Sequence, residues 1–466
     1  MGAITENITL WQWILVVGSS ALLFLLSPWS NSKESFFKAN KNGNAPSWIL
    51  LTGSLVISWV FAKSITNASD LGYKYGAVGG LAYAGYYLSF IVAGVTIYYL
   101  RIKGGFKSIH HFLFTRFGKG ALRLFSIVIA FRLFNEIWSN TMVIGGYFGE
   151  VGSSSYYTSI LVFTALTLAY CLKGGLNSSI FSDAIQMGLF AILLVVILYI
   201  FLGRTHVTAT EMINAGEFSW ANGLNLLLVA LLQSFSYPFH DPVMTDRGFI
   251  SSPKTTIRSF ILAGIIGAIC IFLFSFLGVY GKLSGAGVEL NTATQKNVFS
   301  LHALGTVFGP VLLLLINFIM IVSAASTLDS SFSSFSKLAV EDLKLGNTVK
   351  FGRITMIIVA IAGTVPIFFN PAILSATTVS GTMVIGLTPV FLFWKIKAPP
   401  ISFYLSLSVG ILFGVLLGLK LIPNWLIFTD GPYNDLLWSN IFGVALCILL
   451  YFAPILIVKT KNEKNI

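Results

Sequence analysis

The sequence predicts an all-α polytopic membrane protein with about 13 transmembrane helices. Of its 466 residues, 56% are hydrophobic and 10% are charged, and the mean hydropathy is +0.83. In soluble chains about a quarter of the residues are charged, whereas a helix that crosses a bilayer needs about 20 predominantly apolar residues. Runs of that kind recur along the whole chain. The composition therefore excludes a soluble globular protein.

Short connections separate the predicted spans and leave no room for a soluble catalytic domain. The spans lie near residues 9–29, 47–70, 76–100, 120–148, 156–174, 179–203, 219–239, 256–283, 301–335, 352–370, 372–396, 401–422 and 438–459. The first span is too long for the apolar core of a signal peptide and has no basic region before it, so we expect it to be retained.

Lys and Arg residues are distributed unevenly between the two sets of alternate connections. Twenty-two of the 29 fall in the set that begins after the first span, and five fall in the other set. Because basic connections stay in the cytoplasm, we expect the N-terminus outside and the C-terminus inside a plasma membrane, of the bacterial inner-membrane type. The net charge of +12 follows from this topology, so the expected partner is a lipid bilayer and not a nucleic acid.

Five charged residues fall inside the predicted spans, where a charge needs a named partner or a function. They are Lys63, Arg132, Glu136, Asp183 and Asp329. Arg132 and Glu136 are four residues apart on one helix, so they can neutralise each other as an ion pair. The alternative is a functional role for Glu136, which should lie near the middle of the membrane.

Two predicted spans are interrupted. The second span contains the polar run 63–70, and the seventh ends in an aromatic cluster around Pro238. Unwound helices are tolerated only where they line a cavity, and transporters bind substrates and ions at such points. Each interrupted span opens a run of five helices, which is the pattern of two five-helix inverted repeats with a site at their interface. The predicted units are 1–46, the repeats 47–203 and 219–396, and the C-terminal pair 397–466.

Residues 323–342, SAASTLDSSFSSFSKLAVED, place eight hydroxyl groups and the carboxylate of Asp329 at the end of the ninth span. Such hard oxygen atoms are ligands for small cations, so this segment is a candidate wall of an ion site. The alternative is a turn at the membrane surface whose hydroxyls bond to their own helix. Its later part, 333–336, is expected to be such an interfacial helix end, with Lys337 in the cytoplasm.

Two segments resemble motifs of the sodium:solute symporter family, which includes sodium-coupled carriers of sugars, proline, pantothenate, sialic acid and iodide. Residues 329–342, DSSFSSFSKLAVED, resemble the D-S-x-L-N-S-x-S-T-x-x-x-x-D stretch of that family, and two hydroxyl residues precede it as they do there. Residues 174–186, GGLNSSIFSDAIQ, resemble its G-G-L-x-x-x-x-x-T-D-x-x-Q motif, with Ser182 in place of Thr.

Two further segments extend the resemblance to about residues 47–396. The segment from Ser54, SLVISWVFAKSITNASDLGYKYG, is similar to the first core helix of the family. Arg247 with SSPKTTIR resembles its cytoplasmic Q-R-x-x-x-A-K segment, with Asp246 in place of Gln. The resemblance implies ten helices in two inverted repeats, preceded here by one helix and followed by two.

The resemblance also implies sodium sites on the first and eighth core helices. The implied ligands of the principal site are the carbonyls of Ile57, Val60 and Ser323 and the hydroxyls of Ser326 and Thr327. Some members of the family have a second site, for which the matching residues are Asp183, Ser326, Asp329 and Ser330. Asp329 adds a carboxylate where those members have a hydroxyl, and it either binds a second sodium ion or neutralises Lys63.

The substrate is less well specified than the ion. The candidates that line its pocket are Lys63, Ser64, Thr66, Asn67, Tyr83, Tyr87, Glu136 and Gln233. Sugar carriers of the family have Gln and Glu where this chain has Ser64 and Tyr83, so a hexose is disfavoured. Lys63 could hold a carboxylate and Glu136 an ammonium group, which favours an amino acid or another zwitterion. Phe235 and Tyr237 are candidate gate residues, with ordinary aromatic packing beside Pro238 as the alternative.

These features predict a sodium-coupled symporter that imports a small polar solute by alternating access. One alternative is a proton-coupled or uniport carrier of the same fold in which Lys63 replaces sodium. Another is a transporter-like membrane sensor, although the short tail offers no output domain. An enzyme is not expected, because the sequence contains neither an HExxH nor a GxSxG motif.

Overall fold

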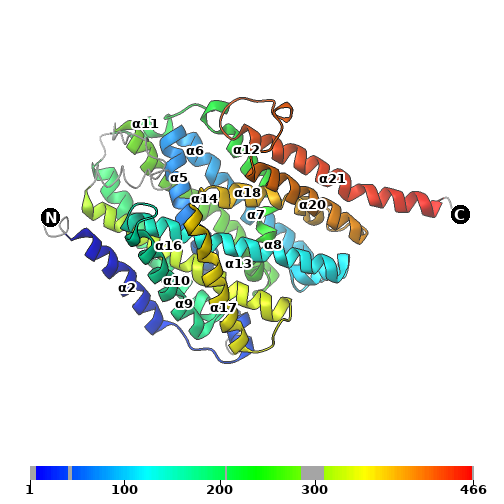
Figure 1. The fold of residues 1–466 in the computed structure, drawn as a ribbon, viewed down its shortest axis with the longest axis horizontal. Helices are drawn as coiled ribbons and strands as arrows, with labels where there is room; N and C mark the ends of the chain where they lie inside the picture. The colour runs from blue at the N-terminus through cyan, green and yellow to red at the C-terminus, as the bar shows by residue number, and fades with distance from the viewer. Residues whose placement is uncertain (1–6, 40–44, 205–206, 285–308, 464–466) are drawn as a thin grey trace.

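The computed structural model is a bundle of helices, which confirms the predicted fold class (Figure 1). It describes residues 7–39, 45–204, 207–284 and 309–463. Within these residues, nine helices are long and apolar enough to cross a membrane, and the bent pair α4 and α5 raises the number to ten. The helix α21 (Asn434–Glu463) extends beyond the body of the bundle, at the end opposite α2 (Ile8–Leu26) (Figure 1).

The first half of the chain supplies α2 and the helices of the first predicted repeat. These are α4 (Trp48–Trp59), α5 (Ala62–Tyr75), α6 (Ala77–Ala84), η1 (Gly85–Tyr87), α7 (Leu88–Ile102), α8 (Ile109–Phe148), α9 (Ser154–Gly174) and α10 (Leu176–Arg204). The short α3 (Lys33–Lys38) lies between α2 and α4, and α11 (Ala209–Ile213) follows α10.

The second half supplies the helices of the second predicted repeat and two more. They are α12 (Leu224–Gln233), η3 (Tyr237–His240), α13 (Pro242–Arg247), α14 (Pro253–Leu283), α16 (Pro310–Lys337), η4 (Leu338–Asp342), α17 (Val349–Thr364), η5 (Val365–Phe369), α18 (Ser375–Met383), α19 (Leu387–Leu392), α20 (Pro400–Gly418) and α21. The first residues of the predicted ninth span, 301–308, lie outside the described residues. The repeat boundaries stay a prediction.

Three predicted spans are less regular than an apolar run suggests. The fourth is α8, which contains the buried Arg132 and Glu136 and kinks at Gly118, where φ is +84°. The seventh is the ten-residue α12 followed by η3, and the eleventh is divided into α18 and α19. All three have polar side chains or broken backbone on their buried faces, which is acceptable in a membrane only inside a protein.

The second predicted span is broken, as expected, but the break lies elsewhere. Helices α4 and α5 meet at an angle of 59°, and the two residues between them, Val60 and Phe61, leave the helical conformation. The polar run 63–70 is itself helical and belongs to α5. Its side chains are buried by neighbouring helices, so they do not have to unwind the backbone.

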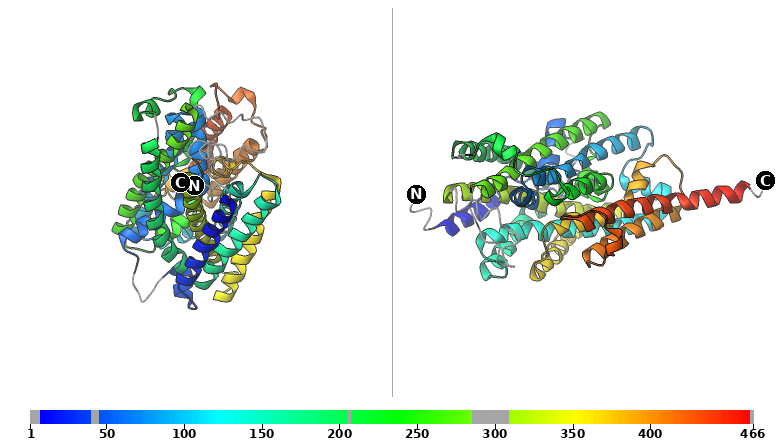
Figure 2. Two further views of the ribbon diagram at one scale, coloured as in Figure 1. Left: turned by 90° about the vertical axis from the view of Figure 1, so that its left-hand side faces the viewer. Right: turned by 90° about the horizontal axis from the view of Figure 1, so that it is seen from above.

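Close approach of two helices fixes α5 against α14. A Cβ atom on Gly278 would lie 1.7 Å from the carbonyl oxygen of Ser69, and one on Gly72 would lie 2.2 Å from that of Ser275. Small residues allow backbones to pack this closely in membrane proteins. Figure 2 shows the helix bundle from two further directions.

The end of α16 is buried, which corrects the expectation of an interfacial helix end. Ser333, Ser334 and Ser336 are at most 1% exposed. The helix continues past Lys337 through a π-helical turn to Asp342. The Lys337 ammonium pairs with Asp246 and does not extend freely into solvent.

Candidate functional site

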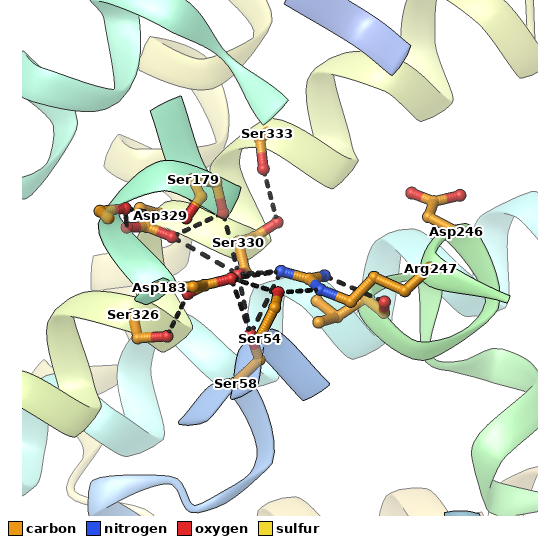
Figure 3. A network of polar contacts seen from close by, with 12 residues as sticks. Ser54, Ser58, Ser179, Asp183, Asp246, Arg247, Ser326, Asp329, Ser330 and Ser333 are labelled. Atoms are coloured by element: carbon orange, nitrogen blue, oxygen red, sulfur yellow. Dashed lines mark hydrogen bonds and ion pairs between the residues drawn. The ribbon is translucent and has the colours of Figure 1, made fainter. Parts of the chain in front are cut away.

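The buried Asp183 carboxylate joins three helices (Figure 3). It projects from α10, and its Oδ2 accepts hydrogen bonds from Ser54 at 2.6 Å and Ser58 at 3.4 Å, both on α4. Its Oδ1 accepts a hydrogen bond from Ser326 of α16 at 2.6 Å. The sequence brings Ser54 and Ser58 to one face of α4 because they are four residues apart. Asp183 therefore links the first core helix to the hydroxyl-rich α16.

Arg247 extends into the same place, although the sequence alone assigned it to a cytoplasmic connection. Its residue is 0% exposed, and its Nη2 lies 2.8 Å from Asp183 Oδ2. The guanidinium also donates to Ser54 at 2.6 Å and to Ser330 at 3.1 Å. The sequence did not reveal that Arg247 is buried, because α13 is only six residues long and has no apolar run. This helix enters the bundle after the break at Pro238.

Asp329 lies one step further along α16, within a ring of hydroxyls. Its Oδ2 accepts from Tyr170 at 2.9 Å and from Ser182 at 2.7 Å. Its Oδ1 accepts from Ser179 at 2.8 Å and from Ser330 at 3.4 Å. Among the residues that the structure describes, it makes no ion pair. The proposed neutralisation of Lys63 by Asp329 is therefore wrong.

Lys63 pairs instead with Glu136. The two are buried, and Glu136 also pairs with Arg132 one turn earlier on α8, which confirms the expected intrahelical pair. Arg132 has a second partner, Asp241 Oδ2 at 3.0 Å, to which the Trp59 indole donates at 2.9 Å. Two cations and two carboxylates thus form one buried network without net charge. Asp241 was not among the five predicted buried charges, because it lies beyond the apolar part of the seventh span.

The principal-site candidates divide between the end of α4 and the middle of α16, two helices that approach each other where Ser58 Oγ lies 3.3 Å from Ser330 Oγ. No hydrogen bond to the carbonyl oxygen of Ile57 or Val60 is found within the described part of the chain. The hydroxyl of Ser323 is buried and has no hydrogen-bond partner among the residues that the structure describes. The carbonyl of Ser323 accepts from Thr327 Oγ1 at 2.9 Å, so its hydroxyl is the freer oxygen of that residue.

Polar side chains from three helices, α5, α6 and α18, meet beyond the α4 and α5 break. The Tyr83 hydroxyl lies 3.2 Å from Ser64 Oγ and accepts from Asn67 at 3.2 Å. It also lies 3.5 Å from Thr377 Oγ1 of α18, a residue that sequence reasoning missed. Only its place on a short hydroxyl-rich stretch, SATTVSGT, could have indicated it. These four residues form a polar cluster, which we call the Tyr83 cluster.

The remaining substrate candidates have other partners. Thr66 bonds to the Ala62 carbonyl of its own helix at 3.0 Å, and the Tyr87 hydroxyl donates to the Trp59 carbonyl at 2.6 Å. Gln233 accepts from Tyr86 at 3.1 Å and donates to Thr382 at 3.2 Å and Asn440 at 3.0 Å. Gln233 therefore joins α12 to α18 and α21.

The two gate candidates differ in their surroundings. The Tyr237 ring is buried, packs against Trp59 with ring centroids 5.8 Å apart, and lies 5.0 Å from the Arg132 guanidinium. It therefore adjoins both the break in α4 and the charged network. Phe235 is 38% exposed. Its ring is not enclosed with that of Tyr237, and the pairing of these two residues as one gate finds no support.

A cavity of about 480 Å³ opens beside the end of α16. Asp246, Lys337 and His110 are among its lining residues. Burial raises the pKa of the Asp246 carboxyl above its usual value, and the Lys337 ammonium beside it acts in the opposite direction. In Figure 3 the Asp246 side chain points away from the guanidinium of Arg247. Neighbouring residues of α13 thus make two separate ionic contacts, with α16 and with α10.

Comparison with solved structures identifies the architecture. One match, described as the substrate-bound outward-open state of a Na+-coupled sialic acid symporter, has a TM-score of 0.67 and 16% sequence identity, and covers 96% of this chain and 98% of that chain. The chain has an inverted-repeat transporter fold. Two structures of Mhp1, a nucleobase-cation-symport-1 family transporter, also match. The closed structure has a TM-score of 0.56 at 13% sequence identity, and the match covers 90% of this chain and 96% of that chain.

The second Mhp1 structure is inward facing and has a TM-score of 0.51 at 13% sequence identity. This match covers 93% of this chain and 96% of that chain. No family model and no curated protein sequence matches the chain. These neighbours are transporters and not enzymes, and the chain is a multi-pass membrane protein of their fold. The similarity to sodium:solute symporter-type carriers inferred from the motifs is confirmed at the level of the fold.

Proposed function

We propose that the chain is a sodium-coupled secondary active symporter that imports a small polar solute by alternating access. The observation that carries the proposal is a set of unpaired oxygens at the break in the first core helix. The Ile57 and Val60 carbonyls accept no hydrogen bond within the described part of the chain, and the buried Ser323 hydroxyl has no partner. Buried polar groups without partners are rare, and unwound carbonyls of this kind bind sodium in transporters.

The neighbouring hydroxyls have the polarity that a cation needs. Thr327 donates its proton to the Ser323 carbonyl, and Ser326 donates its proton to Asp183. Each hydroxyl oxygen therefore keeps lone pairs for a positive ion and has no proton to point at it. Five neutral oxygens from Ile57, Val60, Ser323, Ser326 and Thr327 suit a monovalent cation. The site uses either oxygen of Ser323, and its hydroxyl is the one without a competing bond.

Sodium entry supplies the driving force in this proposal. With the N-terminus outside and the C-terminus in the cytoplasm, as the basic residues favour, sodium enters with a membrane potential that is negative inside. That potential contributes about 2.3 kcal/mol per elementary charge per 100 mV. Sodium bound at the end of α4 holds the break in α4 and α5 in one conformation, and the Tyr83 cluster on α5 and α6 is then ready for the solute. Coupling is reciprocal, so the solute strengthens sodium binding by the same factor.

The charge balance supports a solute without net charge. Lys63, Arg132, Glu136 and Asp241 balance one another, so a solute with a net charge would leave one buried charge without a partner, which is costly. A zwitterionic amino acid meets this condition, as does an uncharged polar molecule. The hydroxyl and amide groups of the Tyr83 cluster donate and accept hydrogen bonds for it.

A carrier in which Lys63 replaces sodium is less well supported. Its ammonium group is already paired with Glu136 on α8. The distinction is testable: uptake that persists when choline replaces sodium, and that stops with a protonophore, would favour that alternative.

The test of the proposal uses the unpaired hydroxyl of Ser323. Thermal unfolding of the purified chain is followed in sodium chloride and in choline chloride, with a panel of amino acids, carboxylates, nucleosides and urea. Ser323→Ala should reduce the stabilisation by sodium without lowering stability in choline, since it removes a hydroxyl that has no partner. Thr327→Ala should also reduce it.

The matched control is Ser402→Ala on α20, which removes another buried hydroxyl without a partner. It should leave the sodium response unchanged. If Ser323→Ala and Ser402→Ala respond to sodium alike, or if the unaltered chain is indifferent to sodium, the proposed site is wrong.

A further inference from the structure

The residues matched to a second sodium site already have partners in this chain. Both oxygens of Asp183 accept hydrogen bonds, Oδ1 from Ser326 and Oδ2 from Ser54 and Arg247. The Ser330 hydroxyl lies within hydrogen-bond distance of Ser58 and Ser179 and accepts from Arg247. The residues that would ligate an ion are thus engaged with one another and with a guanidinium.

Asp329 offers no spare acceptor either. A carboxylate accepts about four hydrogen bonds, and the Asp329 carboxylate receives four, from Tyr170, Ser179, Ser182 and Ser330. A sodium ion there would have to displace at least one of these hydroxyl donors. The donor set around Asp183 and Asp329 therefore does not fit an added sodium ion.

The guanidinium of Arg247 is held in this place by the chain itself. Its Nη1 donates to the Val243 carbonyl of its own helix at 3.0 Å, which leaves Nε and Nη2 directed at Ser54 and Asp183. The residue is 0% exposed, and so is Asp183. An arginine stays charged at any ordinary pH, so this cation is always present when α13 is in the bundle (Figure 3).

We propose that Arg247 is the built-in cation of the second site, so that the chain couples transport to a single sodium ion. The inference rests on the proposed function and adds its stoichiometry. One positive charge suffices for Asp183, and the guanidinium supplies it with one charge-assisted hydrogen bond, from Nη2 to Oδ2 at 2.8 Å. A sodium ion at Asp183 would have to remove a buried guanidinium from its only carboxylate partner in the described residues, which is strongly unfavourable.

Equilibrium binding of radioactive sodium to the purified full-length chain tests this proposal without a known solute. The unaltered chain should bind one sodium ion at saturation. Thr327→Ala should weaken this binding, whereas Asp183→Asn combined with Arg247→Gln, which keeps the site neutral, should still bind one ion. Two ions on the unaltered chain, or an ion that is lost in the double variant and kept in Thr327→Ala, would overturn the inference. No bound sodium at all would instead refute the proposed function.

A gain of binding gives the sharper result. Arg247→Gln removes the guanidinium and leaves Asp183 with its hydroxyl neighbours, so bound sodium at saturation should rise two-fold. Arg247→Lys keeps a cation and should still bind one ion. The control is Arg101→Gln, because Arg101 bonds to Gly248, Ser251 and Thr256 and, within the described part of the chain, to no carboxylate; it should bind one ion. An Arg247→Gln chain that folds and still binds only one ion would also overturn the proposal.

Where Arg247→Gln does not fold, the Arg247→Lys and double-variant measurements still decide the matter. Both keep the site without net charge: Arg247→Lys replaces one cation by another, and the double variant replaces both charged side chains by amides. Two ions on either variant would contradict the proposed role of the guanidinium.

Discussion

Glu136→Gln is the most informative perturbation of the buried charges. The carboxylate of Glu136 pairs with two cations, Lys63 and Arg132, and its side chain is 4% exposed. The amide has nearly the same shape, so the substitution removes one negative charge without opening a cavity. Asp241 then remains as the only carboxylate of the network, against two buried cations.

The expected cost follows from that charge count. Removing one partner of a buried ion pair costs about 3–5 kcal/mol, mostly because the other partner is left without compensation. We expect Glu136→Gln to destabilise the chain by about that amount. Adding Lys63→Met removes the surplus cation and leaves Arg132 with Asp241, so the double variant should recover about 2 kcal/mol of the loss.

Unfolding in mixed micelles with a rising fraction of sodium dodecyl sulfate, followed by tryptophan fluorescence, measures these free energies. The matched control is Glu150→Gln, just past the C-terminal end of the same helix, where the residue is exposed; its effect should stay within about 0.5 kcal/mol. If Lys63→Met and Glu136→Gln add without any recovery, the four side chains do not act as one network, and the charge argument for a solute without net charge loses its basis.

Two further contacts give predictions of other kinds. Gly278→Ala should prevent the folded chain from accumulating, because its Cβ would lie 1.7 Å from the carbonyl oxygen of Ser69. Fluorescence-detected size-exclusion chromatography should then show loss of the monodisperse peak. The control Gly188→Ala, which has open space around its Cβ, should leave the peak intact. Asp246→Asn and Lys337→Met should be coupled by about 0.5–3 kcal/mol in a double-mutant cycle, since the two pair at the end of α16; a coupling near zero would mean that their pairing contributes nothing to holding α13 there.

Much of the fold was predictable because spans are encoded locally. An apolar run of sufficient length forms a helix in a bilayer whatever its neighbours, since every backbone group must be bonded within the segment. The breaks were predictable from Pro238 and from the polar run 63–70, although the second of these only located the break to within a few residues. The polar run 63–70 stayed helical because other helices bury its side chains, and the sequence of the run alone does not show which helices pack against it.

The candidate site was predictable in part. The hydroxyls of Ser323, Ser326 and Thr327 were identified from their position on a buried span, and the structure joins Ser326 to α4 through the Asp183 carboxylate. Which oxygen of Ser323 is free could not be predicted, since it depends on the rotamer of Thr327 one turn later.

The sequence by itself determined the class of protein, the order of its helices and the five charges within the apolar spans, because each of these follows from composition and periodicity along one segment; it missed the buried Asp241 and Arg247. Only the tertiary structure decided which groups neutralise each other. Arg247 and Asp183 are 64 residues apart, and Arg132 and Asp241 are 109 apart. Such pairs are selected by how helices pack, and in an interior of low dielectric the nearest opposite charge dominates all others. The guanidinium beside Asp183 is the clearest product of that packing.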